Sequence, residues 1–233
     1  MKKVMKAVAA LMLMTAMVCA SGCNKEPISG SYNGHEYVDL RLPSGTLWAT
    51  CNVGATTPED YGDYFAWGET TSKTTYNWST YQYCNGGDGW NTLTKYCSST
   101  TYGYNGFTDN LTVLQAGDDA ATANWGIGWS MPTREQWQEL VDNTNNKWTT
   151  QNGVNGRLFT ARNGKTLFLP AAGNYIDNEI DLAGSCGCYW SSSLTEGSPY
   201  DAWYFELTHF FGAGLSGMIY RSTGSPIRPV HVN

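Results

Sequence analysis

The pattern of apolar and polar positions predicts strands near the start of the chain and a long aperiodic stretch after them. Residues 37–42, Tyr-Val-Asp-Leu-Arg-Leu, alternate between apolar and polar side chains, as a strand with one buried face does. A Pro-Ser-Gly turn follows, so residues 46–53 are expected to return as the second strand of a hairpin. Residues 70–110 lack periodicity, which predicts a long ordered loop region or an insertion with short strands.

Two helices are predicted in the middle of the chain. Residues 118–125 begin with two acidic side chains, which favour a helix N-terminus, and they stop before a glycine. A second helix is expected from Thr133 to Asn143, because Thr133 and Gln136 have the spacing of a capping box. Apolar residues then recur at spacings of i, i+3 and i+4, which places them on one face of that helix.

Short strand-like segments follow the second helix. Gly and Pro punctuate them, and they cover residues 157–160, 166–169, 189–192, 202–207, 218–220 and 227–232. Two helices early and many short strands late predict an α+β fold. The chain has no exact internal repeat, which disfavours a propeller or a solenoid.

The start of the chain has the features of a bacterial lipoprotein signal. Three lysines precede an apolar run too short to span a bilayer, and small residues lead to Cys23 as in a lipobox. We therefore predict a signal peptide over residues 1–22, lipidation of Cys23, a lipidated tether over residues 23–35 and one folded domain over residues 36–233. Lipidation would anchor the protein in the outer membrane, on the cell surface. The alternative is ordinary secretion, because Ala20 stands where a lipobox more often has Leu.

Composition and charge narrow the classes of partner. Cleavage after residue 22 would remove three lysines and no acidic residue, so the formal net charge of −6 would become −9. Such a surface repels a phosphate backbone, which argues against nucleic acid as a partner. Charged residues are scarce, whereas Trp, Tyr and Gly are abundant, which indicates a loop-rich domain with aromatic packing. We expect contact with the membrane through the lipid anchor alone.

The cysteines suggest one disulfide and one pair of neighbouring thiols. Cys84 and Cys97 bracket a Gly-rich loop and could close it as a disulfide; free thiols are the alternative. Cys186 and Cys188 are two residues apart, so both side chains face the same side of a strand. Two thiols leave zinc without its other ligands, so we predict packing or a variable position, and no metal or cofactor.

The last third of the chain alternates between dense aromatic segments and chemically mixed runs. A rigid scaffold that holds adaptable loops is typical of a binding protein, and the runs contain no obvious catalytic set. The residues predicted to contact a ligand are Asn174, Tyr175, Asp177, Thr195, Glu196, Tyr200, His209, Phe210 and Phe211. Asp177, Glu179 and Asp181 also alternate along one run, but a full set of calcium ligands is not visible.

Several motifs together resemble the Fibrobacter succinogenes major paralogous domain family: YVDLRLPSGTLWATCNVGA, EDYGDYFAWGET, GWSMPTREQWQEL, LFLPAAG, YWSSS, AWYFEL and IRPV. The resemblance covers nearly all of the chain after Glu36, although Ser130 stands where the family commonly has Arg. It implies a surface lipoprotein of Bacteroides-like bacteria with a C-type-lectin-like fold, shared with formylglycine-generating enzymes and the variable proteins of diversity-generating retroelements. The strand near residues 37–42 is then expected to pair with that near 227–232. Core packing is expected of Trp125, Trp129, Trp137, Trp190 and Trp203.

The resemblance favours a non-enzymatic binding module for a protein or glycan ligand, with the mixed runs as its binding face. Those runs match the segments that retroelements diversify in related proteins. Glu179, Glu196 and Met218 cannot be reached from the codons that such systems randomise, so a static paralogue is the other reading. Two other functions remain open. An oxidase of the formylglycine-generating type would need a cysteine pair nearer the C-terminus, and a structural envelope lipoprotein would have no diffusible ligand.

Overall fold

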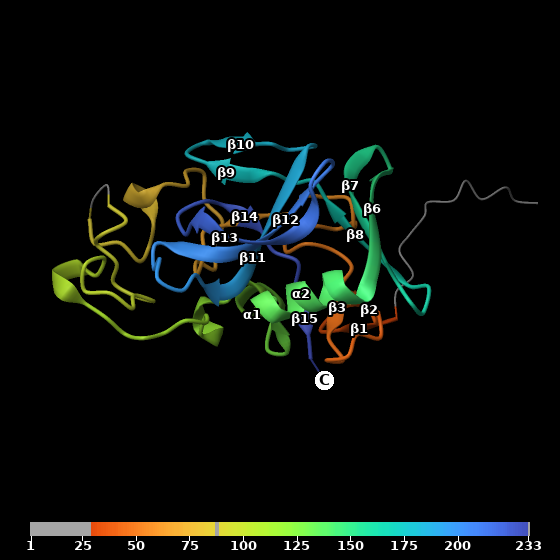
Figure 1. Ribbon diagram of the computed structural model, residues 1–233, viewed down its shortest axis with the longest axis horizontal. Coiled ribbons are helices and arrows are strands. Elements are labelled where there is room, and N and C mark those ends of the chain that lie inside the picture. Colours follow the sequence, from red (N-terminus) through yellow and green to blue (C-terminus); the bar gives the residue numbers. More distant parts are fainter. Residues whose placement is uncertain (1–28, 87–88, 233) are drawn as a thin grey trace, which may run out of the picture.

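Five small antiparallel sheets and two α-helices make up the part of the chain that the structure, a computed structural model, describes: residues 29–86 and 89–232 (Figure 1). Strand residues outnumber helical ones, and the architecture is α+β, as predicted. Three short 3-10 helices, η1 (Trp78–Thr80), η2 (Tyr104–Gly106) and η3 (Ala116–Asp118), lie in the long segment between β4 and α1. None of the described helices is both long enough and apolar enough to cross a membrane.

The largest sheet joins the two ends of the described chain. Its strands, in spatial order, are β1 (Gly30–Tyr32), β2 (His35–Val38), β3 (Leu47–Ala49), β15 (Val230–His231) and β5 (Trp129–Ser130). The predicted hairpin is confirmed, because Tyr37 pairs with Ala49. The expected direct pairing of residues 37–42 with 227–232 is wrong. The connection over residues 39–46, with a turn at residues 42–45, returns β3 to the edge of β2, so β3 takes the place that β15 was expected to fill.

The predicted signal peptide, Cys23 and the first part of the tether lie outside the described residues. Residues 30–32, which the sequence assigned to the tether, form β1 and pair with β2. The ordered part of the described chain therefore begins before Glu36.

Both predicted helices are present. In α1 (Ala120–Trp125) the Asp119 side chain caps the N-terminus by accepting from the backbone N–H of Thr122, and the helix ends at Gly126. In α2 (Arg134–Asn143) the predicted capping box between Thr133 and Gln136 is complete. Local capping chemistry is sufficient to place both starts.

A central three-stranded meander consists of β11 (Cys186–Leu194), β12 (Asp201–Thr208) and β13 (Gly212–Tyr220), with β12 in the middle. The helix α2 lies against one face of this sheet, and in Figure 1 the hairpin of β9 (Asn174–Ile176) and β10 (Glu179–Asp181) lies on the other side. Two further sheets are β6 (Thr144–Gln151), β7 (Val154–Ala161) and β8 (Thr166–Pro170), and β4 (Tyr64–Phe65) with β14 (Ser225–Pro226).

Buried aromatic side chains fill the interior in two clusters. Four of the five tryptophans predicted for the core are buried: Trp125, Trp129, Trp137 and Trp190. Trp203 is the exception. It is only half-buried, and one of its ring faces is covered by the guanidinium of Arg134 at 4.3 Å from the ring centroid.

The buried side chain of Arg221 holds two described parts of the long segment between β4 and α1. Its guanidinium donates to the carbonyl oxygens of Lys95, Tyr96 and Pro199, at 3.0, 3.0 and 2.8 Å, and to the hydroxyl of Tyr81 at 2.9 Å. One cation therefore ties this segment to the turn between β11 and β12.

The disulfide predicted between Cys84 and Cys97 is absent from the structure, in which both residues are free cysteines. The two thiols point to different acceptors. Cys84 Sγ lies 3.3 Å from the carbonyl oxygen of Gly89, and Cys97 Sγ lies 3.1 Å from that of Ser99. Backbone hydrogen bonds from Asn85 to Thr92 and from Thr94 to Tyr83 join the two sides of this loop in place of a covalent link.

Candidate functional site

The nine residues predicted to contact a ligand lie in three separate places. Three belong to β9 and the turn after it, three to the turn between β11 and β12, and three to the turn between β12 and β13. The two turns of a meander lie at opposite ends of its middle strand. The three runs therefore do not form a single binding face.

The residues of the first run serve mainly in packing. Asn174 is buried, and the ring of Tyr175 packs against Tyr64 and Tyr76, with centroid distances of 5.6 and 5.1 Å. Asp177 is exposed and accepts a hydrogen bond from the side chain of Asn77 at 2.9 Å. These contacts explain the ordered β9–β10 hairpin where the sequence indicated an irregular run.

Two of the three residues of the second run also contact other parts of the protein. The Thr195 hydroxyl donates to the carbonyl oxygen of Gly217 at 2.9 Å, while Glu196 is exposed. The ring of Tyr200 packs against Trp90 and Tyr102, with centroids 5.4 and 5.0 Å away. Glu196 alone of these three predicted contacts remains open to a ligand.

Next to this turn, burial raises the pKa of the Asp201 carboxyl from 3.8 to about 6. Between these pH values the folded protein holds a proton that the unfolded chain has lost, so stability falls as the pH rises through about 6. We expect Asp201→Asn to match the parent protein near pH 4 and to exceed its free energy of unfolding by up to about 3 kcal/mol near pH 7.5. Urea denaturation at the two pH values measures this. Glu196→Gln, in the same turn but exposed, is the control without a pH-dependent gain; an Asp201→Asn protein no more stable than the parent at pH 7.5 contradicts the prediction.

The third run lines an open groove at the β12–β13 turn. Phe210 and Phe211 are 86% and 93% exposed, and His209 lies between them and Trp148, with ring centroids 4.7 Å from Phe210 and 5.6 Å from Trp148. The groove has a volume of about 490 Å³, and its other lining residues are Asn155, Leu182, Gly184, Ser185, Cys186, Glu206 and Thr208. All three predicted contacts of this run therefore border one cavity.

The frame of this groove is fixed by hydrogen bonds. The buried guanidinium of Arg157 donates to the carbonyl oxygen of Thr208 at 2.6 Å, and the Thr208 hydroxyl accepts from the backbone N–H of Phe211 at 2.9 Å. Across the groove, Leu182 has a φ of 60°, in the left-handed region that a bulky side chain rarely adopts. Strained residues of this kind persist mostly at functional sites.

Two thiols and a carboxylate lie at the inner end of the groove. Cys186 Sγ is 3.5 Å from Cys188 Sγ and 3.7 Å from Glu206 Oε1. The pKa of the Cys188 thiol is raised well above its usual value by the hydrogen bond with Cys186, then by burial and by the negative charge of Glu206. In the metal-free protein this thiol is therefore protonated near neutral pH and is a poor nucleophile.

No protein-family model, curated protein or solved structure matches the chain. The assignment of the site therefore depends on its geometry.

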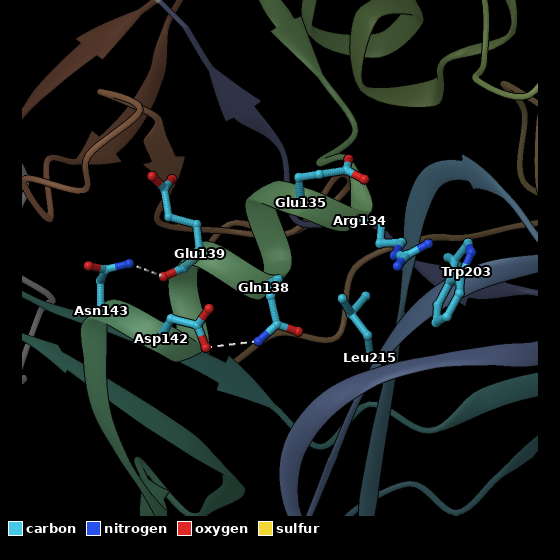
Figure 2. Close-up of a pocket in the computed structure, with 8 residues that line it drawn as sticks. All are labelled: Arg134, Glu135, Gln138, Glu139, Asp142, Asn143, Trp203 and Leu215. Atoms are coloured by element: carbon cyan, nitrogen blue, oxygen red, sulfur yellow. Dashed lines mark hydrogen bonds between the residues drawn. The ribbon is translucent and has the colours of Figure 1, made fainter.

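A second hollow, of about 550 Å³, lies between α2 and β13 and contains none of the nine predicted residues. Figure 2 shows Arg134 reaching from the first turn of α2 toward Trp203, with Leu215 beside it. Polar groups along the helix bond among themselves: Gln138 donates to Asp142 at 2.8 Å. Trp203 was predicted for the core, because an aromatic side chain on a strand is more often buried.

The acidic residues considered for calcium do not converge. Among residues 29–86 and 89–232, the only group of three potential metal ligands with atoms within 4.8 Å of one another is Cys186, Cys188 and Glu206. Asp177 is instead bonded to Asn77, and Glu179 and Asp181 are exposed on β10. The sequence reasoning missed Glu206, which only the pairing of β11 with β12 brings beside the cysteines.

Proposed function

We propose that the protein is a binding module that captures a protein ligand in the groove at the β12–β13 turn. The observation that carries the proposal is the pair Phe210 and Phe211, almost fully exposed on a hydrogen-bonded turn beside an apolar cavity. Exposed apolar surface next to a cavity is typical of an interaction site, because covering it releases water.

The chemistry of the lining favours a protein segment with a large apolar side chain over a glycan. The exposed lining of the groove is mostly apolar and includes Phe210, Phe211, Trp148 and Leu182, so little polar surface is available to bond sugar hydroxyls. Aromatic side chains with few rotatable bonds are efficient anchors because little conformational entropy is lost on binding. His209 and Glu206 can set the orientation of a bound segment.

The cellular setting is part of the same proposal. The lipobox-like residues before Cys23 support a lipid anchor in the outer membrane, with the domain on the cell surface. The motif resemblance supports a C-type-lectin-like fold and membership of the Fibrobacter succinogenes major paralogous domain family. In such a protein the groove at residues 209–211 would be presented to partners outside the cell.

The test is selection from a phage-displayed random peptide library on the purified protein. We expect enriched peptides to contain an aromatic or large aliphatic residue. A synthetic peptide from that pool should bind the Phe210→Ser, Phe211→Ser double variant about 30-fold more weakly, because loss of two anchors costs about 2 kcal/mol or more.

The matched control is Met218→Ser, which removes an equally exposed apolar side chain (85%) from β13 outside the groove and should leave the affinity unchanged. Equal affinity of the double variant and the parent protein would overturn the proposal. Binding to a glycan array that is indifferent to the two phenylalanines would overturn it as well.

A further inference from the structure

The cysteines and the carboxylate in the groove occupy fixed positions on two paired strands. Cys186 and Cys188 are two residues apart on β11, so their side chains share one face of the sheet. Glu206 on β12 lies directly opposite Cys188, and directly opposite residues of an antiparallel pair also share a face. Three potential ligand atoms are therefore held together by backbone pairing and not by loop conformation.

The two distances from Cys186 Sγ to the other ligand atoms suit tetrahedral zinc. With Zn–S bonds of about 2.3 Å, the 3.5 Å between the two sulfurs corresponds to an S–Zn–S angle of about 100°. With a Zn–O bond of about 2.1 Å, the 3.7 Å from Cys186 Sγ to Glu206 Oε1 corresponds to an S–Zn–O angle of about 115°. Both angles lie close to the tetrahedral value of about 109°.

The surroundings leave Glu206 without an ion-pair partner among the described residues and leave room for a metal ion. In the described part of the chain, no lysine or arginine forms an ion pair with Glu206. The neighbour of Glu206 on β13 is Gly214, and a Cβ built there would meet nothing within 4 Å. Cys186 and Glu206 also line the groove, so the group is open to solvent on that side.

We infer that Cys186, Cys188 and Glu206 form a zinc site whose fourth coordination position opens into the groove. Three protein ligands with one open position are the arrangement of zinc sites that bind water or an exogenous donor atom. The two thiolates select a thiophilic metal over calcium or magnesium. The open position is suited to an imidazole or carboxylate of a molecule in the groove. The sequence alone predicted no metal, because it presented two of the three ligands.

The test measures metal binding by the full-length protein under reducing conditions, with no peptide present. After removal of metal with a chelator and dialysis against zinc, we expect about one zinc per chain by mass spectrometry. Substitution with Co²⁺ should give a thiolate-to-metal charge-transfer band and the visible bands of tetrahedral cobalt. Absence of these bands and of stoichiometric zinc in the parent protein overturns the inference without any variant.

Variants then identify the ligands. Cys186→Ser and Cys188→Ser should each abolish stoichiometric zinc, and Glu206→Gln should weaken binding at least about 10-fold, whereas Cys51→Ser should bind as the parent does. Circular dichroism verifies that each variant is folded. Retention of zinc by a folded Cys188→Ser protein overturns the inference.

The inference of a zinc site and the proposed function are tested independently. The Phe210→Ser, Phe211→Ser double variant should still bind zinc, because neither residue is a ligand. Peptide binding without zinc binding would contradict the zinc site alone. Zinc binding without peptide binding would contradict the proposed function alone.

Discussion

Replacement of Trp137 by alanine is expected to lower the free energy of unfolding by about 3–5 kcal/mol, the usual cost of removing a buried tryptophan. The Trp137 ring stacks on Phe205 with centroids 4.4 Å apart and planes 2° apart, and it lies 4.7 Å from the ring of Trp48. Its indole N–H donates to the carbonyl oxygen of Trp190 at 3.2 Å. The substitution therefore removes the main contact of α2 with the central sheet, leaves a cavity and leaves a buried carbonyl oxygen without this donor.

Urea denaturation followed by tryptophan fluorescence and by circular dichroism measures this loss. The matched control is Trp203→Ala, which removes the same side chain from a half-buried position over Arg134 and should cost clearly less. If the two variants were equally destabilised, Trp137 would not be the principal contact between α2 and the sheet.

Replacement of Arg221 by methionine is expected to be about as damaging, at about 3–5 kcal/mol. Methionine fills a similar volume but donates no hydrogen bond, so it leaves three carbonyl oxygens, two of them buried, and the hydroxyl of Tyr81 without this donor. The cation also lies 5.0 Å from the ring centroid of Trp67, a contact that methionine cannot reproduce electrostatically. Lysine should fail to restore stability, because one ammonium group cannot reach acceptors arranged for a planar guanidinium.

Arg221→Met is expected to loosen one segment of the chain as well as to destabilise the whole domain. Because Arg221 holds residues 81–96, Arg221→Met should expose the segment over residues 70–110 to limited proteolysis before the rest of the chain unfolds. Arg41→Met, which removes an exposed arginine paired with Asp39, is the control and should change stability by less than about 1 kcal/mol. A parent-like proteolysis pattern for Arg221→Met would show that other contacts order the segment.

The features that were predictable from the sequence are those encoded by neighbouring residues. The caps at Asp119 and Thr133 have local signatures, and both helices begin where those signatures indicate. The strand β6, Thr-Asn-Asn-Lys-Trp-Thr-Thr-Gln, was missed because polar residues predominate in it, and its strand conformation depends on pairing with β7.

Features that depend on distant pairing were not predictable. The insertion of β3 between β2 and β15 and the position of Glu206 opposite Cys188 both arise from pairing between segments that are separated along the chain. The nine residues predicted to contact a ligand lie in different surroundings for the same reason. The turn between β12 and β13 places His209, Phe210 and Phe211 beside a cavity. The rings of Tyr175 and Tyr200 instead pack against aromatic side chains from other parts of the chain.

The interior position of β15 in the largest sheet has a consequence for how the protein is made. β15 pairs with both β3 and β5 and follows both of them along the chain, so it is synthesised after its two partners. Until it arrives, β3 and β5 each present an open edge and the sheet cannot close. Pairing between residues so far apart along the chain also makes folding slow. The sheet should therefore close only after β15 has been synthesised, and deletion of Val230 and His231 should prevent its closure.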